Sequence, residues 1–125
     1  MNIPRPPAHI EPYVTALGAE AAVQFFLHFG GAELSIPRKP KPGSDLVEKL
    51  GVEAAWALCA LADRTALQRR VPIPKPWLAR YLKTVDGLSH AAIARRLHAS
   101  DISVRRWVAG RDDRAFPNKD QLSLF

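Results

Sequence analysis

The sequence has little cysteine and no long hydrophobic segment. Its one cysteine, Cys59, cannot form a disulfide within the chain. Because Cys59 lies in the apolar run of residues 54–62 and has no neighbouring base, we expect a buried, reduced thiol rather than a nucleophile. No apolar run is long enough to cross a bilayer, and the start of the chain has no signal of basic, apolar and small residues in order. We therefore expect a soluble, cytoplasmic protein.

The chain also lacks the residue sets that carry catalysis. There are no paired carboxylates, no nucleophile with a base, no Gly-rich phosphate loop and no metal-ligand spacing. His90 and His98 are candidate metal ligands, but no Cys or carboxylate cluster accompanies them. The prediction is a protein that is not an enzyme and that has no catalytic residue, metal or cofactor.

Positive charge is concentrated in the second half of the chain. Residues 1–63 contain five Lys and Arg and seven Asp and Glu, a net charge of −2, whereas residues 64–119 contain thirteen and four, a net charge of +9. Such asymmetry is typical of a protein that binds phosphate groups of nucleic acid. A solvated basic surface would give the same count, so charge alone does not distinguish nucleic-acid binding from an ordinary solvated surface.

Residues 88–110 have the spacing of a helix-turn-helix. Six apolar residues are expected on the facing sides of the two helices: Ile93, Ala94 and Leu97 from the first, and Val104, Trp107 and Val108 from the second. Ser89 and Ser100 are placed to cap the two helices, and Gly110 is placed to end the second. His98 stands where Gly is common, so either it adopts a left-handed conformation or the turn differs.

The remaining residues of the second helix are expected to meet DNA. The predicted base-reading set is Ser100, Asp101, Ile102, Ser103, Arg105 and Arg106. Arg can bond guanine bidentately, Ile102 can contact a thymine methyl, and Asp101 can accept from cytosine or cap the helix. The predicted phosphate contacts are Arg69, Arg70, Lys75, Arg80, Arg95 and Arg96. The alternative is a three-helix unit that packs only against other protein.

Residues 76–83 are predicted to form the first helix of this three-helix unit, with Pro76 near its start. Trp77, Tyr81 and Val85 would then cover the core. Base stacking is the alternative role for Trp77 and Tyr81.

An internal repeat precedes this unit. A helix that begins at Gly18 and ends near Gly30 is followed by an extended segment with Ile-Pro-Arg at 36–38, and a helix that begins at Gly51 is followed by one with Ile-Pro-Lys at 73–75. We expect the extended segments to be short β-strand linkers. Because two amphipathic helices and two edge segments make too small a core, a second copy of the chain is expected to complete it as a homodimer, with strands exchanged or paired between subunits.

From residue 13 to residue 110 the chain resembles the Mor transcription activators of Mu-like phages. The resemblance lies in the order of six features: a helix, Gly-Gly, Ile-Pro-Arg-Lys, Gly-x-Glu-Ala-Ala, Ile-Pro-Lys and a helix-turn-helix. Ile73, Pro74 and Lys75 match the family's linker. Five residues match its helix-turn-helix framework: Leu88, Ala94, Ser100, Val104 and Trp107. The chain departs from the pattern at Ala62-Asp63, where a second Gly-Gly often occurs, and in a longer, more basic loop at 64–70.

The resemblance implies a dimer that binds an inverted repeat in double-stranded DNA, in a bacterial or phage-infected cell, with RNA polymerase as a candidate partner. The expected fold is mainly α, with an N-terminal helical dimerisation domain, short β-strand linkers and a C-terminal trihelical domain. The expected divisions are a Pro-rich flexible arm at 1–12, dimerisation domain and linker at 13–75, helix-turn-helix domain at 76–112 and a flexible tail at 113–125.

The tail ends in a second motif, Gln121, Leu122, Ser123, Leu124 and Phe125. This string resembles the peptide that binds the bacterial sliding clamp, and an amide with three apolar side chains suits a groove on a partner. The alternative is that the tail folds back onto the protein's own surface. The competing function is an interaction protein that occupies the clamp and modulates DNA replication, with DNA binding secondary.

Overall fold

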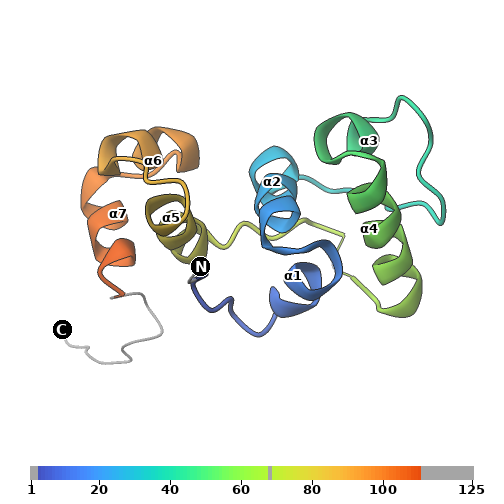
Figure 1. Ribbon diagram of the computed structural model, residues 1–125, viewed down its shortest axis with the longest axis horizontal. Coiled ribbons are helices and arrows are strands. Elements are labelled where there is room, and N and C mark those ends of the chain that lie inside the picture. Colours follow the sequence, from blue (N-terminus) through green and yellow to red (C-terminus); the bar gives the residue numbers. More distant parts are fainter. Residues whose placement is uncertain (1–2, 68, 111–125) are drawn as a thin grey trace. The chain divides into compact units, whose positions relative to one another are not determined.

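The computed structural model describes residues 3–67 and 69–110 of the chain, and these ranges are mainly helical (Figure 1). The helices are α1 (Glu11–Leu17), α2 (Ala19–Phe29), α3 (Asp45–Leu50), α4 (Val52–Arg64), α5 (Lys75–Thr84), α6 (His90–Leu97) and α7 (Asp101–Val108). The predicted mainly α fold class is confirmed. The chain forms two compact units, which we call the helical unit (Pro6–Pro74) and the three-helix unit (residues 3–5 and 75–110).

The predicted internal repeat has a structural counterpart in the helical unit. A short helix, α1 or α3, is joined to a longer one, α2 or α4, through a single glycine. Gly18 has φ 87° and ψ 156°, and Gly51 has φ 89° and ψ 162°, so both junctions have the same backbone geometry. The similarity of residues 18–22 to residues 51–55 therefore reflects two copies of one helix junction.

The core of the helical unit is built largely from α1, α2 and α4. Tyr13 stacks on Phe25 at 5.8 Å between ring centroids and meets Phe26 edge-on at 5.2 Å. Leu58 and Cys59 of α4 are fully buried, as predicted for the cysteine. Burial raises the pKa of the Cys59 thiol, which keeps the group protonated at neutral pH.

Residues 10–12 of the predicted Pro-rich flexible arm are instead part of the folded helical unit. Ile10 is fully buried and α1 begins at Glu11. Proline does not prevent this, because Pro12 occupies the first turn of α1, where the missing N–H has no helical partner to lose. Burial of Ile10 and Tyr13 outweighs the extended tendency of the proline-rich sequence.

The predicted β-strand linkers are not seen. Among the described residues, the two extended segments meet at one isolated antiparallel bridge, between Glu33 and Arg70. Val71 N–H donates to the Ala32 carbonyl at 2.9 Å, and Leu34 N–H donates to the Arg69 carbonyl at 2.8 Å. This backbone pairing does not extend into β-strands because the prolines at 37, 72 and 74 have no N–H to donate. The segments thus pair with each other within one chain.

Gly30 and Gly31 have separate reasons to lack a side chain. A Cβ on Gly30 would collide with the Phe26 carbonyl oxygen of α2 and would lie 3.0 Å from the Cβ of Ile73, so the end of α2 and the close approach of the second extended segment both favour glycine. Gly31 has φ 85°, which turns the chain out of α2 toward the bridge.

The three-helix unit has its own small core. Its most deeply buried side chains come from all three helices: Trp77, Leu78, Leu82, Ile93, Leu97 and Val104. Within the described ranges of the chain, no helix combines the length and apolar character needed to cross a membrane.

Candidate nucleic-acid interface

Side-chain caps define the starts of α6 and α7. Ser89 Oγ accepts a hydrogen bond from the Ala92 N–H at 3.1 Å, and Ser100 Oγ accepts one from the Ser103 N–H at 3.1 Å. Each cap satisfies an N–H that has no partner within its helix. Both caps predicted from the sequence are confirmed, so the boundaries of the two helices follow from local chemistry.

The turn between α6 and α7 passes through His98, which has φ 52° and ψ 49°. Of the two possibilities left open by the sequence, the left-handed one is observed, and this residue is the one described non-glycine with positive φ. The conformation costs an L-residue about 1–2 kcal/mol. It brings the chain from the end of α6 to the Ser100 cap within three residues.

The apolar faces of these helices pack inward. Ile93, Leu97 and Val104 are at most 1% exposed, whereas Ala94, Trp107 and Val108 are half-buried. On α5, Trp77 and Tyr81 are buried, with their ring centroids 5.8 Å apart. Of the two roles considered for these rings, the structure supports the core and not base stacking.

The opposite side of α7 presents a polar, basic face to solvent, which we call the α7 face: Asp101, Ile102, Arg105 and Arg106. Their spacing of one, four and five positions places them on one side of the helix. Ile102 is 71% exposed, so its side chain is not used in packing within the unit. Ser100 is exposed beside them, and Ser103 is half-exposed.

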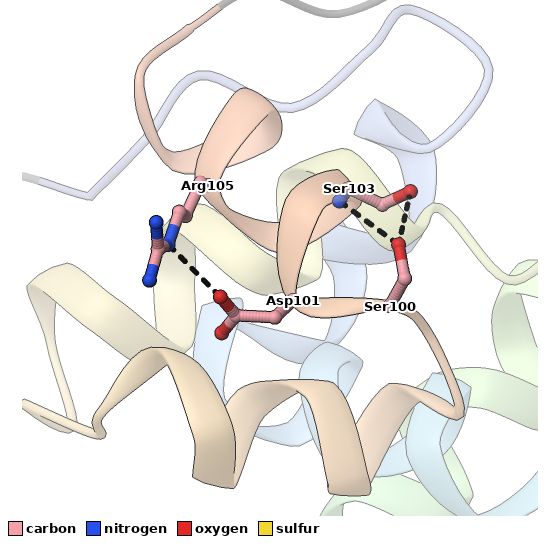
Figure 2. Close-up of polar contacts among 4 residues, drawn as sticks. All are labelled: Ser100, Asp101, Ser103 and Arg105. Carbon is pink, nitrogen blue, oxygen red and sulfur yellow. Dashed lines mark hydrogen bonds and ion pairs between the residues drawn. The ribbon is translucent and has the colours of Figure 1, made fainter.

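The side chains at the start of α7 are held by local contacts (Figure 2). Arg105 Nε lies 2.9 Å from Asp101 Oδ2, and Ser100 Oγ lies 3.0 Å from Ser103 Oγ. An exposed ion pair contributes little to stability, so its main effect is on the position of the guanidinium group. The pair is made through Nε, and the terminal guanidinium nitrogens are the ones that bond guanine O6 and N7 in bidentate recognition. Asp101 therefore orients Arg105, while capping is carried out by Ser100.

The predicted phosphate contacts fall into three groups. Arg95 and Arg96 are exposed on α6, and Lys75 is half-exposed at the start of α5. Arg80 of α5 is half-buried, and its Nη1 donates to the Trp107 carbonyl at 3.2 Å, near the end of α7. This contact joins the two helices and favours a structural role for Arg80.

The third group, Arg69 and Arg70, belongs to the helical unit. Arg70 Nη1 donates to the Gly31 carbonyl at 2.7 Å, and Nη2 lies 3.7 Å from a carboxylate oxygen of Glu33. Both contacts reinforce the bridge between the extended segments. The structure therefore gives Arg70 a role within the helical unit, and it leaves Arg69 exposed.

The three-helix unit is strongly basic. Residues 75–110 contain seven Lys and Arg and two Asp and Glu, a net charge of +5. One of the two acidic residues, Asp101, is paired with Arg105. The unit therefore has the positive potential that attracts a polyanion.

One contact of this unit was missed from the sequence. Residues 3–5 belong to the three-helix unit, and the indole N–H of Trp77 donates to the Pro4 carbonyl at 2.8 Å. No local sequence pattern predicts a contact between Pro4 and Trp77, which are far apart in the chain. The Asp101–Arg105 pair was also missed, although its spacing of four residues on a helix is a recognisable signal.

The five residues of the clamp-like motif, 121–125, lie outside the described residues. In the part of the chain that is described, no three His, Cys, Asp or Glu side chains gather where they could hold a metal ion. Comparison of the chain with protein-family models, with curated proteins and with solved structures finds no match. A functional interpretation thus depends on the residues of the three-helix unit themselves.

Proposed function

We propose that this protein is a sequence-specific, double-stranded-DNA-binding transcription regulator of the Mor type, which acts as a dimer on an inverted repeat. In this proposal the three-helix unit is a helix-turn-helix domain and α7 is the helix that enters the major groove. The observation that carries the proposal is the α7 face, which combines two exposed arginines with an exposed isoleucine on a basic unit.

Each residue of the α7 face has a role in this proposal. Arg105, oriented by Asp101, bonds the O6 and N7 atoms of a guanine. Ile102, at the first turn of the helix, contacts a thymine methyl, because the N-terminal residues of a recognition helix come closest to base edges. Arg106 reads a second base.

Basic residues away from this face position the protein on the duplex. Arg95 and Arg96 on α6 and Lys75 on α5 contact phosphates in the proposal, which adds affinity without reading sequence. The resemblance to Mor activators supports the same assignment.

Selection from randomised duplexes followed by footprinting tests the proposal. The full chain is expected to enrich an inverted repeat whose half-sites lie about 10–10.5 base pairs apart, or a multiple of that. On genomic DNA beside its own gene it should protect such a repeat, with affinity that falls steeply as salt increases. Failure to enrich any sequence, even in dilute buffer, would contradict the proposal.

A second candidate function depends on the five C-terminal residues, Gln121 to Phe125, which match the clamp-binding peptide at every position. We propose that they recruit the protein to the bacterial sliding clamp. The full chain is expected to be retained on immobilised clamp, whereas a chain that ends at Asp120 should pass through. A chain with Leu124→Ala and Phe125→Ala should behave like the truncated one, and equal retention of all three would eliminate this role.

A further inference from the structure

The outer side of α4 carries an apolar stripe that no part of the described helical unit covers. Val52 is 59% exposed and Trp56 is 49% exposed, one helical turn apart, and the next turn presents exposed Ala60. The side of the same helix that faces away from the stripe is buried, with Leu58 fully enclosed and Leu61 3% exposed. A half-exposed tryptophan beside an exposed valine is typical of a protein contact, because each would otherwise be favoured in the core.

Two charged residues flank this stripe on the same edge of α4. Glu53 and Arg64 are eleven positions apart, so at 100° per residue they differ by only about 20° around the helix axis. Both are exposed, and neither forms an ion pair with another described residue. Asp63, which lies toward the other edge, is already paired with Arg38 of its own chain at 3.7 Å.

The exposed side of α4 is complementary to the same side of α4 in a second copy of the chain. When two identical helices pack antiparallel about a two-fold axis, the same edge of each helix meets. Glu53 of one copy then faces Arg64 of the partner subunit, and the pair occurs twice. Trp56 faces Ala60 of the partner subunit, where the small side chain leaves room for the indole. Both pairings have their midpoint near residue 58, so a single axis satisfies them together.

We infer that a second copy of this chain covers the α4 stripe, through antiparallel pairing of α4 with α4. The inference rests on the proposed function in that it supplies the dimer that an inverted repeat requires. One helix pair is smaller than a standard interface, so the dimer is expected to be reversible. Trp56 is its anchor, because large aromatic residues dominate such contacts.

Sedimentation equilibrium on the full chain tests the inference with four variants. Trp56→Ser should weaken dimerisation about thirtyfold or more. Glu53→Arg and Arg64→Glu should each weaken it, because each places like charges opposite one another, and the double variant should recover most of the loss. Glu48→Arg, an exposed position on α3, is the matched control and should sediment like the original protein.

The charge exchange separates pairing from helix stability. Glu53 lies in the first turn of α4 and Arg64 in the last, where each also suits the helix dipole. The double variant loses both dipole interactions, so recovery of the dimer in it can come only from restored pairing. Circular dichroism of each variant confirms that the helices remain folded.

Three results would overturn the inference: a monomeric original protein, a Trp56→Ser variant that dimerises equally well, or a double variant no better than the single ones. Binding to a duplex with one half-site distinguishes this failure from failure of the proposed function. If the protein binds a half-site specifically and Trp56→Ser leaves its dimerisation unchanged, only the α4 contact is refuted. A chain that dimerises through α4 but prefers no duplex refutes DNA recognition alone.

Discussion

Replacing Arg105 with Ala is expected to remove much of the protein's preference for its DNA site while the fold remains intact. The side chain is 68% exposed, and among the described residues it forms an ion pair only with Asp101 on the same helix, so stability should change little. Loss of a bidentate contact to guanine should reduce discrimination at that base pair roughly 5- to 150-fold. Competition binding with the selected site and with a site changed at one base pair measures the effect.

Arg96→Ala is the matched control for this experiment. Arg96 is also an exposed arginine of the three-helix unit, but it lies on α6 and is assigned to a phosphate. Its removal should weaken binding to all duplexes equally and reduce the slope of log affinity against log salt by about 1. If Arg105→Ala also weakens all duplexes equally, Arg105 contacts phosphate and the assignment of α7 as the reading helix is wrong.

Asp101→Asn distinguishes orientation of Arg105 from direct reading by Asp101. If Asp101 only orients the guanidinium, its loss should relax specificity at the base that Arg105 reads, and removal of a negative charge should raise affinity for unrelated duplexes. If Asp101 instead accepts a hydrogen bond from cytosine, specificity should relax at a different base pair. Combining Asp101→Asn with Arg105→Ala shows whether the two effects add.

The parts of the structure that the sequence predicted are those set by neighbouring residues. Ser89 and Ser100 form their caps within three positions, and the buried residues Ile93, Leu97 and Val104 follow the helical period. The sequence placed the turn at His98 and left two conformations open there, of which the left-handed one is observed. These features depend on local backbone geometry, which the sequence specifies directly.

Apart from the local Asp101–Arg105 pair, the site contacts that the sequence did not predict join residues far apart in the chain. Arg70 and Glu33 are joined across the bridge, and Arg80 reaches the Trp107 carbonyl of another helix, so neither arginine could be distinguished from a phosphate ligand by composition. The proline-rich start has an extended local tendency, but Ile10 is buried by tertiary packing. A long-range contact leaves no periodic signal along the chain.

Trp77→Ala is expected to have the largest effect on stability. Trp77 is fully buried, its ring packs on Tyr81, and its indole N–H donates to the Pro4 carbonyl at 2.8 Å. Truncating a buried tryptophan costs about 3–5 kcal/mol. Since a unit this small has little stability to lose, the three-helix unit should unfold at temperatures that leave the helical unit folded. Hydrogen exchange measured by mass spectrometry should show loss of protection confined to α5, α6 and α7.

The contact with Pro4 can be measured separately, by removing residues 1–5 from the chain. Deletion takes away the carbonyl that accepts the Trp77 N–H, and a buried donor without its acceptor costs about 1–3 kcal/mol. In a Trp77→Phe background the donor is already absent, so the same deletion should cost much less. Urea unfolding of the original chain, the two single changes and the combination gives the coupling energy directly. Equal costs in both backgrounds would show that residues 3–5 do not stabilise the three-helix unit through this hydrogen bond.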